Sequence, residues 1–361
     1  MPPSKSAPAP APAPTPSPPP APARAPREAW QRAVRWETGL ALVVLIIIGF
    51  GLHESSQFLT SSNLFNAGVS NGEIAIMALP MTLIIVSGEI DLSVASTLGM
   101  SSALLGVLWQ HRWPMLAIFA VVLIAGAAAG LLNGLLITRL GLPSLAVTIG
   151  TLALYRGIAL ILLGSNTVSD FPPGYTSIGV NPVPHLGVPY SIAIFVVLGV
   201  IFGIVLHGTP VGRSIFAMGN NAETALFSGI RVKRIKTGLF VTSGVIAAMA
   251  GVLWTFRLST AVQNNGIGAE LNVVAVVLLA GASIFGGRGS VPGVVLAVIA
   301  FSLLQNALLL SNFNQEAYGI VVGALLLVSV FVPNAGVLTR QARAALRVRA
   351  AARADAHGSG L

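Results

Sequence analysis

Hydrophobic residues form long runs along most of this chain, and short polar segments separate them. Ten runs are long enough to cross about 30 Å of hydrocarbon as helices; they cover residues 37–57, 72–90, 92–110, 115–138, 143–163, 189–207, 237–256, 269–285, 291–311 and 317–332. Six runs precede one long polar interruption at residues 208–236, and four follow it. The pattern predicts an all-α polytopic membrane protein with about ten transmembrane helices.

Two of the runs are more polar than the others. Residues 92–110 contain five serines and threonines, and residues 269–285 contain Glu270, Asn272 and several glycines. Polar backbone or side chains at membrane depth are tolerated where they face protein or a water-filled cavity. We therefore expect these two segments to be broken or re-entrant helices, and eight full spans with two partial ones is the alternative count.

The composition agrees with a membrane protein. Hydrophobic residues make up 54% of the chain and charged residues 9%, whereas soluble domains carry about 25% charged residues. The first 26 residues hold 12 of the 23 prolines, a composition typical of extended, disordered segments. We predict three parts: a disordered cytoplasmic tail at residues 1–36, a membrane domain at 37–334 and a basic cytoplasmic tail at 335–361.

The basic residues predict the orientation of the chain. With the N-terminus inside, 17 of the 20 lysines and arginines fall in cytoplasmic segments, only Arg112 and Arg257 fall in external loops, and Arg156 falls inside a span. This bias follows the positive-inside rule and predicts that both termini are cytoplasmic. The net charge of +9 then lies where anionic lipid headgroups meet it. It is not a sign of nucleic-acid binding.

The polar interruption at residues 208–236 predicts a cytoplasmic loop with a short helix. The Gly-Asn-Asn sequence at 219–221 is typical of a turn, and residues 222–227 form a helical run that Ser228 and Gly229 close. Such a helix, with an apolar face of Ala225, Leu226 and Ile230, is too short to be stable alone in water. We expect it to lie in a groove of a soluble partner rather than on its own membrane domain.

Glycines recur at every fourth position at 126, 130 and 134, and again at 319 and 323. Small residues at this spacing let helix backbones approach closely in lipid. Close packing within one subunit is the expected use, and a dimer face is the alternative.

Two acidic residues, Glu89 and Asp91, stand between the second and third runs. Asp91 or Ser93 could cap the following helix, with Glu89 at the membrane interface. The alternative is a direct role in a substrate path, because ionisable residues at membrane depth are costly and usually functional.

Uncharged polar residues also occur within or beside the spans and need partners there. With the acidic pair they form our candidate substrate pathway: Glu89, Asp91, Ser93, Asn133, Tyr155, Asn264, Asn272 and Asn306. An amide-rich lining suits a neutral, polyhydroxylated solute better than an ion.

Several kinds of chemistry are absent from the sequence. The chain has no cysteine, no HExxH motif and no phosphate-binding Gly-rich loop that ends in Lys-Ser/Thr. We expect no catalytic residue, metal site or cofactor in this chain. An ion-coupled secondary transporter that uses Glu89 or Asp91 is the main alternative to a transporter driven by a partner protein.

Four segments resemble the permeases of ribose/xylose-type bacterial ABC sugar importers. They are GEIDLSVAS at 88–96, LPSLAVTIGTLALYRG at 142–157, GRSIFAMGNNAETALFSGI at 212–230 and VVLLAGASIFGGRGSVPG at 276–293. The resemblance covers residues 61–334. Glu89 and Ala95 stand where the family signature usually has glycine, and Thr224 stands where alanine is common. The second segment is similar to permeases of the rhamnose branch.

The resemblance implies a permease subunit in the bacterial inner membrane that imports a neutral monosaccharide: a pentose, a hexose or a deoxyhexose such as rhamnose. It implies three partners: a cytoplasmic ATPase that binds ATP and Mg, an extracytoplasmic sugar-binding protein, and a second, identical or paralogous, permease. Residues that would couple this chain to the ATPase are Gly219, Asn220, Glu223, Gly229 and Arg231.

Overall fold

The computed structural model describes residues 26–314, 317–328 and 331. The described part is helical, and its labelled helices are α1 (Pro26–Glu54), α2 (Ser61–Val86), α3 (Val94–Gln110), α4 (Met115–Leu140), α5 (Ser144–Leu163), α6 (Pro173–Val180), α7 (Tyr190–Gly203), the π-helix η1 (Ile204–Gly208), α8 (Pro210–Asn220), α9 (Ala222–Phe227), α10 (Val232–Leu258), α11 (Ala269–Leu279) and α12 (Val291–Leu310). A further apolar helix covers Ala317–Val328.

Each of the ten hydrophobic runs overlaps a helix in the described residues. Seven helices are long and apolar enough to cross a membrane, with η1 continuing α7, and three apolar helices are shorter: α3, α11 and Ala317–Val328. The two runs with many polar residues, 92–110 and 269–285, form two of these shorter helices. They are α3, of 17 residues, and α11, of 11 residues. The expectation of a helical, polytopic membrane protein is confirmed.

Several predicted boundaries were wrong. Helix α1 begins at Pro26, inside the predicted disordered tail, and the rest of that tail lies outside the described residues, as does the tail at 335–361. Helix α2 begins at Ser61 rather than at Gly72, because side-chain hydrogen bonds engage polar residues such as Asn63 and Asn71 inside the bundle. Helix α11 ends at Leu279, and a glycine-rich loop with positive φ at Gly281, Gly286 and Gly287 follows it.

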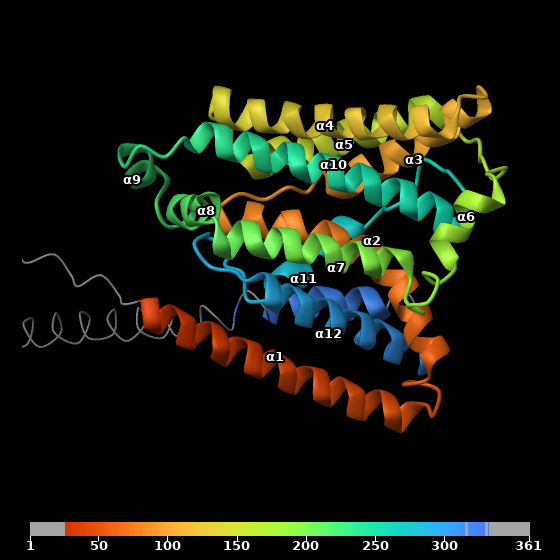
Figure 1. The fold of residues 1–361 in the computed structure, drawn as a ribbon, viewed down its shortest axis with the longest axis horizontal. Helices are drawn as coiled ribbons and strands as arrows, with labels where there is room; N and C mark the ends of the chain where they lie inside the picture. The colour runs from red at the N-terminus through yellow and green to blue at the C-terminus, as the bar shows by residue number, and fades with distance from the viewer. Residues whose placement is uncertain (1–25, 315–316, 329–330, 332–361) are drawn as a thin grey trace, which may run out of the picture.

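The long helices run side by side, so the molecule has two ends (Figure 1). The start of α1 lies at the same end as α8 and α9, whereas α6 lies at the opposite end. This arrangement matches the charge pattern, because the five basic residues of 208–236 belong to the α8–α9 end. We refer to this end as cytoplasmic and to the α6 end as external.

Helix α2 lies at the centre of the bundle. All residues from Gly72 to Ser87 are buried, and α2 contacts α7, α10, α11 and α12. The outer helices instead expose apolar side chains, for example Leu45 on α1, Ile124 on α4, Ile161 on α5 and Val197 on α7. Burial inside and apolar exposure outside are what a bundle surrounded by lipid requires.

The glycine stripe on α4 packs within the chain. A side chain at Gly126 would collide with Gly244 and Ala248 of α10, and one at Gly130 with the backbone of Phe240. The two helices therefore approach backbone to backbone, as the spacing predicts for packing inside one subunit. Gly319 and Gly323 have no neighbour of this kind.

Candidate functional site

The loop between α2 and α3, residues 87–93, holds a buried carboxylate. Asp91 Oδ1 accepts hydrogen bonds from the backbone N–H of Ser93 at 3.0 Å and from the Ser93 hydroxyl at 2.6 Å. Asp91 Oδ2 accepts one from the Ser243 hydroxyl of α10 at 2.9 Å. Because Asp91 is only 2% exposed, these donors replace water, and the carboxylate joins the start of α3 to the middle of α10.

The network continues into α4 and α5. Asn133 of α4 donates to the Ser93 hydroxyl at 2.8 Å, and Tyr155 of α5 donates to the Ala129 carbonyl at 2.8 Å, with Asn133 Oδ1 3.5 Å away. All of these side chains are buried. Four predicted pathway residues from three separate segments thus meet in one polar cluster inside an apolar bundle.

The same loop is held from two further sides. Glu89 forms an ion pair with Lys236 at the start of α10. The Ser144 hydroxyl of α5 accepts from the N–H of Ile90 at 3.2 Å, and the Thr148 hydroxyl donates to the Ile90 carbonyl at 3.3 Å. Glu89 is therefore a paired residue at the cytoplasmic end of the bundle.

Four glycines connect this loop to α8. The N–H of Gly287 donates to the Val86 carbonyl at 2.8 Å, and a side chain at Gly219, near the end of α8, would overlap that same carbonyl oxygen and the Gly287 nitrogen. One at Gly286 would lie 2.9 Å from the Gly219 Cα and 3.0 Å from the Gly88 Cα. We call Gly88, Gly219, Gly286 and Gly287 the glycine junction. At Gly219 and Gly286 only glycine fits, because the neighbouring atoms are backbone, and at Gly88 and Gly287 the positive φ favours glycine.

Helix α9 projects beyond the glycine junction at the cytoplasmic end (Figure 1). The Asn221 side chain caps its first turn by accepting from the N–H of Thr224 at 2.9 Å, and Gly229 follows its end with φ of +82°. Within this six-residue helix only Ala225 is buried, while Leu226 and Phe227 are 56% and 83% exposed. The predicted helix is present. Leu226 was expected on its buried face but is exposed, because Ala225 is the one buried residue of α9.

The sequence did not predict α8. Residues 210–220 form an amphipathic helix whose buried residues are Gly212, Ile215 and Met218, and Thr209 caps it by accepting from the N–H of Gly212 at 3.3 Å. The turn expected at Gly219 and Asn220 is the end of this helix. Gly219 is partly buried at the glycine junction, whereas Asn220, Glu223, Gly229 and Arg231 are exposed.

Three predicted pathway residues lie away from the Asp91 network. Asn264 is exposed in the loop before α11, Asn272 is partly buried on α11, and Asn306 of α12 pairs with Asn63 of α2. The structure also adds partners that the sequence reasoning missed: Ser243, Ser144 and Thr148. The only sequence signal for them was a hydroxyl residue within or at the start of an apolar run.

Among the described residues, no group of three or more His, Asp or Glu side chains could hold a metal ion. The polar clusters instead consist of hydroxyls, amides and paired charges. They are suited to hydrogen bonding and to holding helices together.

Comparison with known proteins supports the same class. A family model described as "Branched-chain amino acid transport system / permease component" matches residues 63–330. The autoinducer 2 import system permease protein LsrD of Yersinia enterocolitica is 34% identical over 306 residues, which cover 83% of this chain and 92% of that protein. LsrD of Escherichia coli K12 is 35% identical over 302 residues, covering 82% of this chain and 91% of that protein. No solved structure matches the chain.

The family match and the named relatives make this helical, multi-pass chain a transport component rather than an enzyme. More specifically, the chain belongs to the family of permease components of bacterial transport systems, which lie in the inner membrane. The family description names amino acids and the relatives' names give autoinducer 2. Family membership therefore does not fix the solute.

Proposed function

We propose that this chain is the membrane-spanning subunit of an ATP-driven importer for a small, neutral, polyhydroxylated solute. A binding protein outside the membrane delivers the solute, a cytoplasmic ATPase binds ATP and Mg, and two permease copies, identical or paralogous, enclose the path. The solute is a neutral monosaccharide, such as a pentose, hexose or rhamnose, or the autoinducer 2 for which the relatives' systems are named. One observation carries the proposal: all four motif segments meet around residues 87–93, beside the end of α8.

The exposed side of α9 is the proposed contact with the ATPase. A six-residue helix that exposes Leu226 and Phe227 has too few contacts of its own to be stable. Large apolar side chains on an exposed short helix are typical of an element that lies in a partner's groove. Glu223 and Arg231 flank this apolar pair and would set the charge complementarity.

The glycine junction is the proposed route of coupling. Because Gly219 touches the end of α2 and the loop after α11 through backbone atoms, a displacement of α8 and α9 cannot be absorbed by side-chain rotation there. It would instead move residues 87–93, which carry Glu89 and Asp91. The Asp91 network would then transmit the movement to α3, α4, α5 and α10.

In the described conformation both carboxylates have partners inside the chain. Asp91 accepts three hydrogen bonds and Glu89 is paired with Lys236. A carrier that couples transport to an ion needs a carboxylate that binds and releases that ion. The engaged carboxylates therefore favour ATP coupling over the ion-coupled alternative.

The test is uptake of radiolabelled sugar into proteoliposomes that contain this chain, its ATPase and its binding protein. We expect accumulation when ATP is enclosed on the cytoplasmic side, with no ion gradient imposed. The assay is repeated with ribose, rhamnose and autoinducer 2 to identify the solute. Uptake through this chain alone, driven by a proton or sodium gradient without ATP, would contradict the proposal of an ATP-driven importer.

The contact with the ATPase is tested with Phe227→Ala and Glu223→Lys. Truncation of a central interface residue costs about 2 kcal/mol or more, so Phe227→Ala should weaken co-purification of the ATPase and lower solute-stimulated ATP hydrolysis. Leu186→Ala, which alters an exposed residue at the external end, is the matched control. Full stimulation in both coupling variants, at normal membrane levels, would remove α9 from the interface.

A further inference from the structure

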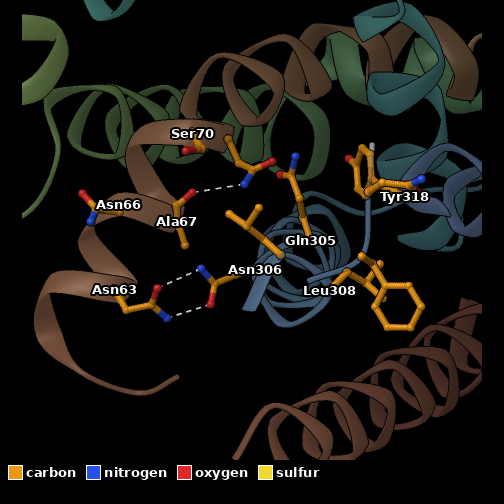
Figure 2. A pocket seen from close by; sticks show the side chains of 12 residues that line it. Asn63, Asn66, Ala67, Ser70, Gln305, Asn306, Leu308 and Tyr318 are labelled. Carbon is orange, nitrogen blue, oxygen red and sulfur yellow. Dashed lines mark hydrogen bonds between the residues drawn. The ribbon is translucent and has the colours of Figure 1, made fainter. Parts of the chain in front are cut away.

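A second polar region lies at the external end of the bundle. It is a cavity of about 290 Å³ between the start of α2, the end of α12 and the helix Ala317–Val328 (Figure 2). Six amide side chains contribute to its lining: Asn63, Asn66, Asn71, Gln305, Asn306 and Asn314. Because α2 runs from this end to the cytoplasmic end, the cavity and the Asp91 network lie at opposite ends of the same helix.

Several buried polar atoms that lack a hydrogen-bond partner in the protein belong to residues that line this cavity. In the described part of the chain six buried side-chain atoms are of this kind, and three of them belong to its lining residues: Asn71 Oδ1, Gln305 Oε1 and the Tyr318 hydroxyl. A buried polar group without a hydrogen bond costs about 1–3 kcal/mol. Because their residues line one cavity, a polar occupant of that cavity is favoured over an apolar one.

The lining specifies the chemistry of that molecule. None of its twelve residues is charged, so a phosphate, carboxylate or ammonium group would lack a counter-charge. Each amide both donates and accepts hydrogen bonds, which matches hydroxyl groups. Leu308, Leu309 and Phe313 add an apolar side for the C–H face of such a molecule. The volume is at the lower limit of ligand pockets, about 300–1,000 Å³, and suits one small solute.

An amide pair bridges two helices at this cavity. Asn63 Nδ2 donates to Asn306 Oδ1 at 2.7 Å, and Asn306 Nδ2 donates to Asn63 Oδ1 at 3.0 Å. Figure 2 shows the two side chains facing each other between α2 and α12, on one side of the cavity. A hydroxyl group can replace either partner of such a pair, so this contact can open without leaving an amide unsatisfied.

We propose that this cavity binds one neutral, polyhydroxylated solute of monosaccharide size, as the external station where the solute rests before it crosses the membrane. Its role in transport rests on the proposed function, whereas the binding itself does not. Asn306, predicted as a pathway residue, therefore belongs to a site distinct from the Asp91 network.

Binding is tested by saturation-transfer NMR on the purified chain in a detergent without a sugar headgroup. The probes are ribose, rhamnose and xylose, with gluconate as a charged comparison. We expect millimolar binding of one or more of the sugars, and no signal from gluconate. Gln305→Leu and Asn71→Leu remove unpartnered oxygens, and Asn66→Trp fills the cavity from an exposed position. Each should reduce the signal at least tenfold, whereas Asn181→Leu, an exposed residue beside α6, should not change it.

Each outcome decides between the two proposals. An unchanged sugar signal in Asn66→Trp would show that the sugar binds elsewhere, and no sugar signal with the unsubstituted chain would show that water alone fills the cavity. Either result would overturn this inference. If ATP-driven uptake in the full complex persists in that case, the proposed function stands without the external site. Sugar binding that Gln305→Leu abolishes, in a chain whose complex shows no ATP-driven uptake, would support the site and overturn the proposed function.

Discussion

Arg257 of α10 donates from Nε to Glu73 Oε1 of α2 at 2.9 Å, in the interior of the bundle. The Glu73 side chain is 1% exposed, and the Arg257 guanidinium also lies over the Trp254 ring, 4.6 Å from its centroid. The sequence had placed Arg257 in an external loop. It is instead the last basic residue of a helix that extends to Leu258, and its charge is balanced within the chain.

Loss of this ion pair should destabilise the protein. Removing one partner of a buried pair costs about 3–5 kcal/mol, because the other charge stays buried. Arg257→Met should therefore lower the melting temperature in detergent, measured by size-exclusion chromatography after heating. The double variant Glu73→Gln/Arg257→Met should recover part of the loss. Equal melting temperatures for the single variant and the unsubstituted chain would show that water or lipid compensates Glu73.

The glycine junction should not tolerate a methyl group. Gly219→Ala places Cβ on the Val86 carbonyl oxygen, and backbone atoms on both sides leave no flexible side chain to move away. We expect loss of ATP-driven uptake together with reduced ATPase co-purification. Gly238→Ala is the matched control, because that helical position is exposed and has no neighbour within 4 Å. It should be neutral, or more stable by up to about 1 kcal/mol.

Uptake that survives in Gly219→Ala at normal membrane levels would contradict the proposed route of coupling. A variant that reaches the membrane, binds the ATPase and fails to transport would place the defect between α8 and the loop at residues 87–93.

Asp91 should act through its hydrogen bonds. Asp91→Asn keeps an acceptor for the N–H of Ser93 and a group that can bond the Ser243 hydroxyl, so uptake should remain ATP-dependent and insensitive to a protonophore when ATP is maintained. Asp91→Ala leaves buried donors without an acceptor, and hydrogen bonds to charged groups are worth about 1.5–3 kcal/mol each. It should lower both stability and uptake. An Asn variant that is as inactive as the Ala variant, yet equally folded, would indicate that the charge itself is required.

The orientation can be tested by cysteine labelling, because the chain contains no native cysteine. A single cysteine at Thr224 should react with an impermeant maleimide in inside-out vesicles only, and one at Leu186 should react in right-side-out vesicles only. Both positions are exposed. Labelling of Thr224 from the external side would reverse the topology and remove α9 from any cytoplasmic partner.

Apolar run length was enough to locate the seven helices that could cross a membrane and the three shorter apolar ones, because a helix in lipid must satisfy its backbone polar groups itself. The first three turns of α2 were not predicted, since Asn63, Asn66 and Ser70 line a polar cavity that local hydrophobicity cannot reveal. The short helix at 222–227 was predicted from its Asn cap and closing glycine, which act locally. Helix α8 was missed because its glycines suggested a turn, whereas Gly219 is required by a contact distant in sequence.

The candidate site was also predictable only in part, because local polarity marks single residues but not the contacts between distant segments. Asp91, Ser93, Asn133 and Tyr155 stood out as polar residues at membrane depth. Their assembly depends on which faces of α3, α4, α5 and α10 meet, and on Ser243, a small hydroxyl residue that no local pattern distinguishes. Asn306 was correctly noted as a polar residue needing a partner, but its partner, Asn63, lay in a segment that had not been assigned to a span.

At Gly219 and Gly286 the atoms in closest contact belong to the main chain, and the main chain is the same whatever side chains surround it. Contacts between backbone atoms at the glycine junction therefore do not depend on which solute the permease carries. A permease could change its external cavity and its polar lining, and so its solute, while keeping the same mechanical connection to the motor. Exchanging α8 and α9 between transporters of different specificity should therefore redirect which ATPase binds and leave the choice of solute unchanged.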